Sequence, residues 1–126
     1  MSPDEFVSAL VLTVFDSTVQ GVVSALESPP GRSPHVRTVA FHEWFVRLPA
    51  RDQRFVVEVV RDATHGALFG MLCVLDGVRA IDSPPHADLA LTAIDGHGSR
   101  ILNERGDLHD LLNALVHPPS EPWADE

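Results

Sequence analysis

The segment from Gly66 to Leu75, GALFGMLCVL, constrains the fold of this chain more than any other. It is a run of ten apolar or small residues, and it continues a helical spacing of apolar residues that starts at Phe55. Together these residues predict one long central helix that begins after Pro49 and ends at Gly77. Such an apolar helix needs other elements packed against it, because burial of apolar surface is what stabilises it.

Small residues fall on one face of this predicted helix, at successive spacings of four, three and four between Gly66 and Gly77. A glycine inside a helix costs about 1 kcal/mol relative to alanine, so we expect another backbone to approach this face closely. The first predicted helix carries small residues around Gly21 and is the expected partner, with a contact between two copies of the chain as the alternative. The residues predicted to pack in this way are Gly21, Ala63, Gly66, Ala67, Gly70 and Cys73.

Two further helices are predicted before the central one. Ser2 as a cap, Pro3 at the first helical position and Glu5 three residues after the cap begin a helix, which ends at the proline-rich break over 28–34. A shorter helix is expected over about 36–47, before Pro49. Its residues expected to point mostly inward are Val39, Phe41, Trp44, Phe45 and Leu48.

The C-terminal third predicts a hairpin and a last helix. Apolar residues alternate with others over 87–94, and the DGHGS turn at 95–99 leads into a second short segment, which is typical of a β-hairpin. Asp107 is the expected cap of a short helix that begins at Leu108. The sequence therefore predicts a mainly helical α+β domain over 1–116, with a flexible, acidic and proline-rich tail over 117–126.

Composition restricts the partners. The chain has 126 residues and a net charge of −9, and all nine of its basic residues are arginine, so we expect it to be repelled by nucleic acid and anionic membranes and to attract basic proteins. No run approaches the roughly 18 uninterrupted apolar residues of a membrane span, and no basic segment precedes an apolar one at the N-terminus. We expect a soluble, cytoplasmic, bacterial protein whose single cysteine, Cys73, is an inert hydrophobe.

The chemistry-bearing residues form no established motif. His42 and Glu43 lack a second histidine at position 46, which is Val46, so a zinc-protease pair does not form. Asp107 and Asp110 flank His109 at a helix start, where acidic residues usually act as caps. No metal site, cofactor or catalytic residue is predicted.

The stretch FHEWFVRLPARDQRFVVEVVRDATHGALFGMLCVLDGV over 41–78, with the hairpin and LHDLLN over 108–113, resembles a group of short bacterial proteins classed as domains of unknown function. This resemblance covers about two-thirds of the chain. It implies a compact bacterial protein and carries over no activity, ligand or site residue.

Two functions are compatible with these observations. The first is a non-enzymatic protein-interaction module, such as an immunity or antitoxin-like protein with a basic partner, since the chain is small and acidic and lacks a convergent catalytic set. The second is a small-ligand-binding protein or enzyme with a pocket between the hairpin and the helices. A homodimer is compatible with either. The candidate ligand-binding residues are Trp44, Asp76, Arg79, His97 and His109.

Overall fold

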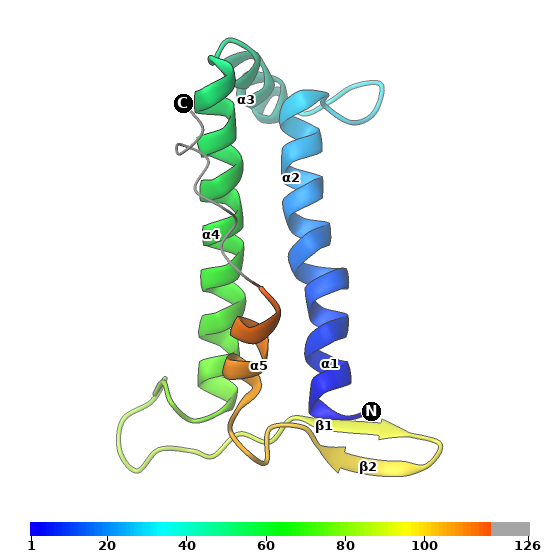
Figure 1. The fold of residues 1–126 in the computed structure, drawn as a ribbon, viewed down its shortest axis with the longest axis vertical. Helices are drawn as coiled ribbons and strands as arrows, with labels where there is room; N and C mark the ends of the chain where they lie inside the picture. Colours follow the sequence, from blue (N-terminus) through cyan, green and yellow to red (C-terminus); the bar gives the residue numbers. More distant parts are fainter. Residues whose placement is uncertain (117–126) are drawn as a thin grey trace.

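The computed structural model describes residues 1–116, a mainly helical chain with one two-stranded antiparallel hairpin and a short last helix (Figure 1). The predicted α+β class is confirmed. The expected tail over 117–126 lies outside the described residues.

The N-terminal rod is one continuous helix made of three segments. α1 (Pro3–Leu10) is followed by a π-helical stretch, η1 (Val11–Asp16), and by α2 (Ser17–Glu27). The predicted start is confirmed, because the Ser2 hydroxyl accepts a hydrogen bond of 3.1 Å from the backbone N–H of Glu5. Ser28 is extended, and the two prolines that follow keep the chain from continuing as a helix.

α3 (Val36–Val46) connects this rod to the long helix α4 (Ala50–Leu75), which runs back antiparallel to it (Figure 1). The central helix is confirmed as predicted, and Gly77 ends it with a φ of +78°, a conformation that favours glycine. In α3 only Phe45 is buried. The inward placement of Phe41 and Trp44 was wrong, since they are 45% and 47% exposed. The cause is that α3 packs mainly on α2, which covers one side of so short a helix.

The hairpin pairs β1 (Thr92–Asp95) with β2 (Gly98–Ile101), and α5 (Leu108–Leu115) then returns toward the two long helices (Figure 1). The predicted hairpin and last helix are confirmed. The side chain of Asp107 makes no capping hydrogen bond, so this detail of the prediction was wrong. The carboxylate that caps α5 belongs instead to Asp76, at the end of α4.

The central core cluster lies where α1, α4 and α5 meet, around Val7, Leu72, Leu108 and Leu112, each at most 1% exposed. Burial of such side chains is the main stabilising contribution to a fold of this size. Above this cluster, the rod and α4 contact each other through a narrower row that contains Phe15.

Asn103, which follows the hairpin, fixes the lower end of the molecule. It is 7% exposed, and its amide nitrogen donates to the carbonyls of Leu75 and Leu89 while its amide oxygen accepts from the N–H of Leu91. All three bonds join segments that are distant in sequence. Asn103 thus ties the end of α4 to the chain that enters the hairpin.

The N-terminal rod bears on the expectation that the chain has no membrane span, which stays a prediction. Pro3–Glu27 is by length and composition able to cross a membrane, although it contains polar residues and Asp16, which interrupt its apolar runs. Only 17% of its most apolar stretch is buried in this structure, whereas the core helix of a soluble protein is mostly buried. The rod is therefore an apolar helix with much of its surface uncovered.

Candidate functional site

α4 has three sides with different environments in its lower half. Leu68 and Leu72 belong to the core that α1 and α5 share with α4. The residue after Leu68 turns toward α5: the Phe69 ring meets the His109 ring edge-on, with centroids 5.8 Å apart. The preceding residues, Ala67 and Met71, are exposed. Two residues along a helix turn it by about 200°, so Met71 lies nearly opposite Phe69.

The same arrangement occurs on the N-terminal rod. Phe15 and Val19 are buried, while Val14 and Thr18, one position before each of them, are exposed. We call the side formed by these preceding residues the open face, because none of the residues 1–116 outside the rod, α3 and α4 lines it. The open face comprises Val14, Thr18, Gly21, Val22 and Ala25 of the rod and Val59, Ala63, Ala67 and Met71 of α4.

Two hollows follow the open face. The lower one has a volume of about 470 Å³ between the rod and α4, and its walls include Val14, Thr18, Ala67 and Met71. The upper one, about 330 Å³, is lined by residues of α2 and α3 that include Phe41. Neither hollow is lined by a charged residue. Solvated helix surfaces normally carry charges, so this surface is unusual for one that faces water.

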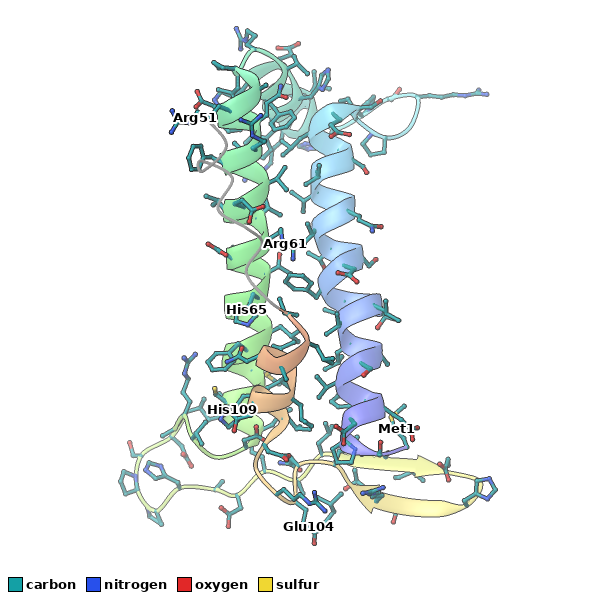
Figure 2. All side chains as sticks on the ribbon, in the orientation of Figure 1. Met1, Arg51, Arg61, His65, Glu104 and His109 are labelled. Carbon is teal, nitrogen blue, oxygen red and sulfur yellow. The ribbon has the colours of Figure 1, made fainter. Side chains whose placement is uncertain are left out.

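Two charged residues of the long helices, Asp16 and Arg61, lie away from the open face. Asp16 is two positions from both Val14 and Thr18, and therefore on about the opposite side of the rod. Arg61 points between the helices, where its guanidinium lies 5.2 Å from the centroid of the Phe15 ring (Figure 2). From residue 63 to residue 75, α4 contains no Asp, Glu, Lys or Arg.

The predicted close contact between the small-residue faces of the first and central helices of one chain is wrong, whereas the alternative contact between two copies stays a prediction. A Cβ placed on Gly66 or Gly21 would meet no atom within 4 Å, and Ala63 and Ala67 are exposed. The reason is that the rod meets α4 one residue further around the helix, through larger side chains. Gly70 and Cys73 are buried, but a side chain rather than a backbone covers Gly70, with Arg79 Nη1 2.5 Å from the position a Cβ would take.

Two of the five candidate ligand-binding residues, Asp76 and His109, come together. Asp76 Oδ2 accepts one hydrogen bond from the backbone N–H of His109 at 2.9 Å and another from its ring Nδ1 at 2.6 Å. An ionised carboxylate only accepts, so Nδ1 of His109 carries the hydrogen. The Asp76 side chain is fully buried, and that of His109 is 16% exposed. We call this pair the polar joint, since it connects the end of α4 to the start of α5.

A second polar contact supports the polar joint. His65 Nε2 lies 2.8 Å from Asn113 Oδ1, and the His65 ring stacks on Phe69, which in turn touches His109 (Figure 2). The contacts of His65 with Asn113 and of Phe69 with His109 hold α5 against α4. The polar joint therefore positions a helix. The other ring nitrogen of His109, Nε2, lies 3.6 Å from Asp110 Oδ1.

The other three candidates lie elsewhere. Trp44 is on α3, at the opposite end of the long helices from the polar joint (Figure 1). His97 is in the hairpin turn, where its backbone N–H donates to Asp95 Oδ1 at 2.7 Å. Arg79 covers Gly70. Among residues 1–116, no group of three His, Cys, Asp or Glu side chains is arranged to hold a metal ion.

The loop between α4 and the hairpin contains one perturbed acid. The backbone N–H of Ala87 and then the His86 side chain donate to the carboxylate of Asp82, and these hydrogen bonds lower the pKa of Asp82 below its usual value. The Asp82 side chain is 38% exposed, and its two hydrogen bonds order this loop locally.

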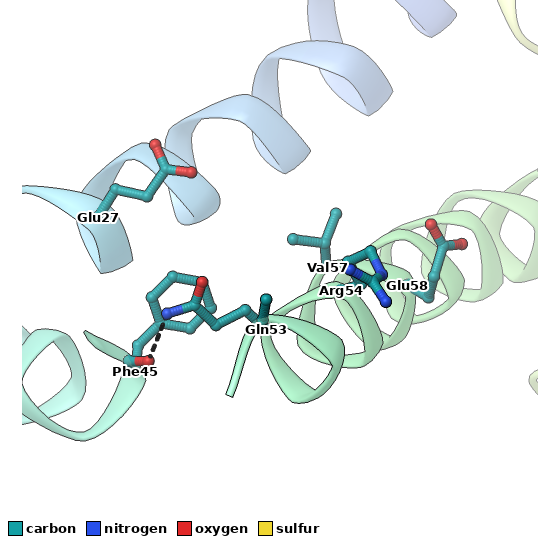
Figure 3. A pocket seen from close by; sticks show the side chains of 7 residues that line it. Glu27, Phe45, Gln53, Arg54, Val57 and Glu58 are labelled. Carbon is teal, nitrogen blue, oxygen red and sulfur yellow. Dashed lines mark hydrogen bonds between the residues drawn. The ribbon is translucent and has the colours of Figure 1, made fainter. Parts of the chain in front are cut away.

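One cavity lies at the upper end of the molecule, where α2, α3 and α4 meet (Figure 3). It has a volume of about 370 Å³, and its lining includes Phe45 and the carboxylates of Glu27 and Glu58. Gln53 Nε2 donates to the carbonyl of Phe45 at 3.0 Å and shapes one wall (Figure 3). The predicted pocket between hairpin and helices is not among the described cavities. A small one of about 150 Å³ is lined by Met1 and hairpin residues.

No family model, curated protein or solved structure matches this chain. The resemblance to short bacterial proteins therefore receives no support from these comparisons.

Sequence reasoning named Asp76 and His109 among five separate candidates without pairing them, and it missed the open face. The signal was present: Val14, Thr18, Ala67 and Met71 each stand one position before a core residue, and no charge occurs over 63–75. This pattern gives a helix two adjacent apolar sides instead of one. The sequence-based prediction placed Ala63 and Ala67 against another backbone.

Proposed function

We propose that this chain is a non-enzymatic protein-interaction module and that the open face is its binding surface. The single observation that carries the proposal is the uncharged, exposed side shared by the rod and α4, with its two apolar hollows. Contiguous exposed apolar surface of this kind marks binding sites in soluble proteins.

The polar joint supports a binding role over a catalytic one. Its carboxylate is used as a helix cap, and its imidazole is held by Asp76 and packed against Phe69. A nucleophile or substrate pocket beside His109 would favour an enzyme, and the described cavities lie elsewhere.

Site-specific photo-crosslinking in the host cell tests this function. A benzophenone amino acid replaces Thr18, on the open face, or Gln20, which is exposed about 200° away on the same helix. We expect a discrete crosslinked product from position 18 and none from position 20. Equal products from both positions, or no product from position 18, contradict the proposal.

A small-ligand-binding function is the second candidate. It is favoured by the cavity in Figure 3, where Glu27, Glu58 and the Phe45 ring outweigh the positive charge of Arg54 in the same lining and suit a small organic cation. Titration with tetramethylammonium, followed by NMR, tests it. Shifts that saturate and centre on Phe45 and Gln53 support this function, and unchanged spectra contradict it.

A further inference from the structure

We propose that the occupant of the open face is a second copy of this chain, which completes a bundle of four long helices across a two-fold axis. This inference rests on the proposed function and names its partner. It starts from exposed apolar side chains: among residues 1–116, sixteen large hydrophobic residues are exposed, and Val14, Val22, Val59 and Met71 of the open face are four of them. The short α5 covers one side of the helix pair, and a second pair of helices would cover the other.

The size of the open face suits a weak, reversible dimer. Its residues span Val59 to Met71 on α4 and Val14 to Ala25 on the rod, about 17–18 Å of helix in each case. Two helices side by side are about 20 Å wide, which gives roughly 350 Å² per copy, below the usual size for specific complexes. We therefore expect monomer and dimer to exchange at high protein concentration, on the order of 100 μM.

Charge favours a second copy over a basic protein. The net charge of −9 attracts basic partners at long range, yet no acidic residue lines either hollow of the open face. A basic partner would find its complementary charges outside this surface. An identical copy brings an equally uncharged surface, and the mutual repulsion of the two acidic chains is screened by salt.

The shape of the open face, with both projections and hollows, is suited to self-association. A two-fold interface uses the same patch on both chains, so the patch needs both projections and hollows. Val22 and Met71, which are 41% and 56% exposed, provide projections. Ala63 and Ala67 provide shallow positions, and Gly21 has open space around its Cα. Small residues at such positions allow helices to approach closely.

Sedimentation velocity on the full chain tests the proposal. Wild type is compared with Thr18→Glu and Ala67→Glu, which place a charge on the open face, and with the matched control Gln20→Glu on the far side of the same helix as Thr18. We expect wild type and Gln20→Glu to shift from 13.7 kDa toward twice that mass between about 1 and 200 μM. The two open-face variants should dimerise at least about tenfold more weakly. Circular dichroism confirms that each variant is folded.

Two further measurements, at different salt concentrations and with lipid vesicles, distinguish a second copy from other occupants of the open face. Raising the salt concentration should tighten a dimer of acidic chains, whereas it would weaken binding to a basic protein. If the chain stays monomeric at every concentration, the proposal that a second copy occupies the open face is wrong. If position 18 of such a monomeric chain still crosslinks to a different protein, the proposed interaction function stands although the partner is not a second copy. Flotation of wild type, but not of Thr18→Glu, with neutral phosphatidylcholine vesicles assigns the open face to a membrane and overturns both.

Discussion

The two sides of α4 in its lower half differ although they are built from adjacent residues. On one side His65, Phe69 and Asp76 make specific contacts with α5. On the other side Ala67 and Met71 face outward with no partner among residues 1–116. Both sides are largely apolar in sequence. The difference shows that it is the position and length of α5, more than hydrophobicity, that decides which side of this helix belongs to the core.

The largest expected effect comes from the side that α5 covers. Leu112→Ala removes a side chain that is fully buried in the cluster with Val7, Leu72 and Leu108. The lost burial and the cavity left behind should lower the free energy of unfolding by about 2–5 kcal/mol, measured in urea. The matched control is Leu115→Ala on the same helix, 47% exposed, which should cost less than about 1 kcal/mol. Equal losses would mean that α5 is not the cover of this core.

Much of the fold could be predicted from local signals. Ser2 with Pro3, the proline at 49, and Gly77 delimit helices because they act on the backbone within a few residues. The hairpin follows from a turn in the same way. The prediction that failed concerns a contact between residues distant in sequence. Whether another helix touches Gly66 depends on which side of α4 the rod packs against, and a rotation of α4 by one residue changes the answer.

The candidate site was predictable in part for the same reason. Asp76 and His109 are both polar residues at helix ends, so each could be chosen separately. Their hydrogen bond spans 33 residues and depends on the path of the hairpin. The cap of α5 could not be assigned correctly from sequence, because Asp107 is the nearer acid and the capping carboxylate comes from another helix.

The polar joint gives an intermediate effect. Asp76→Asn keeps the shape of the side chain but removes the charge that accepts both hydrogen bonds from His109. We expect the free energy of unfolding to fall by about 1–2 kcal/mol, and hydrogen exchange at the His109 amide to accelerate. Asp110→Asn, at a side chain 75% exposed, is the control and should change stability by less than about 0.5 kcal/mol. A protected His109 amide in Asp76→Asn would show that the cap is dispensable.

The smallest effect tests the open side of α4 itself. Gly66 lies in a helix interior with nothing within 4 Å of a built Cβ, so Gly66→Ala should stabilise the monomer by about 0.5–1 kcal/mol through the lower flexibility of the unfolded chain. At Gly70 the same change displaces the Arg79 guanidinium, and Gly70→Ala should gain less. Thermal unfolding, at a protein concentration well below the dissociation constant of the dimer, measures the stability of both variants. A destabilised Gly66→Ala would mean that another backbone lies against this glycine even in the monomer, and the contrast between the two sides of α4 would then lose its basis.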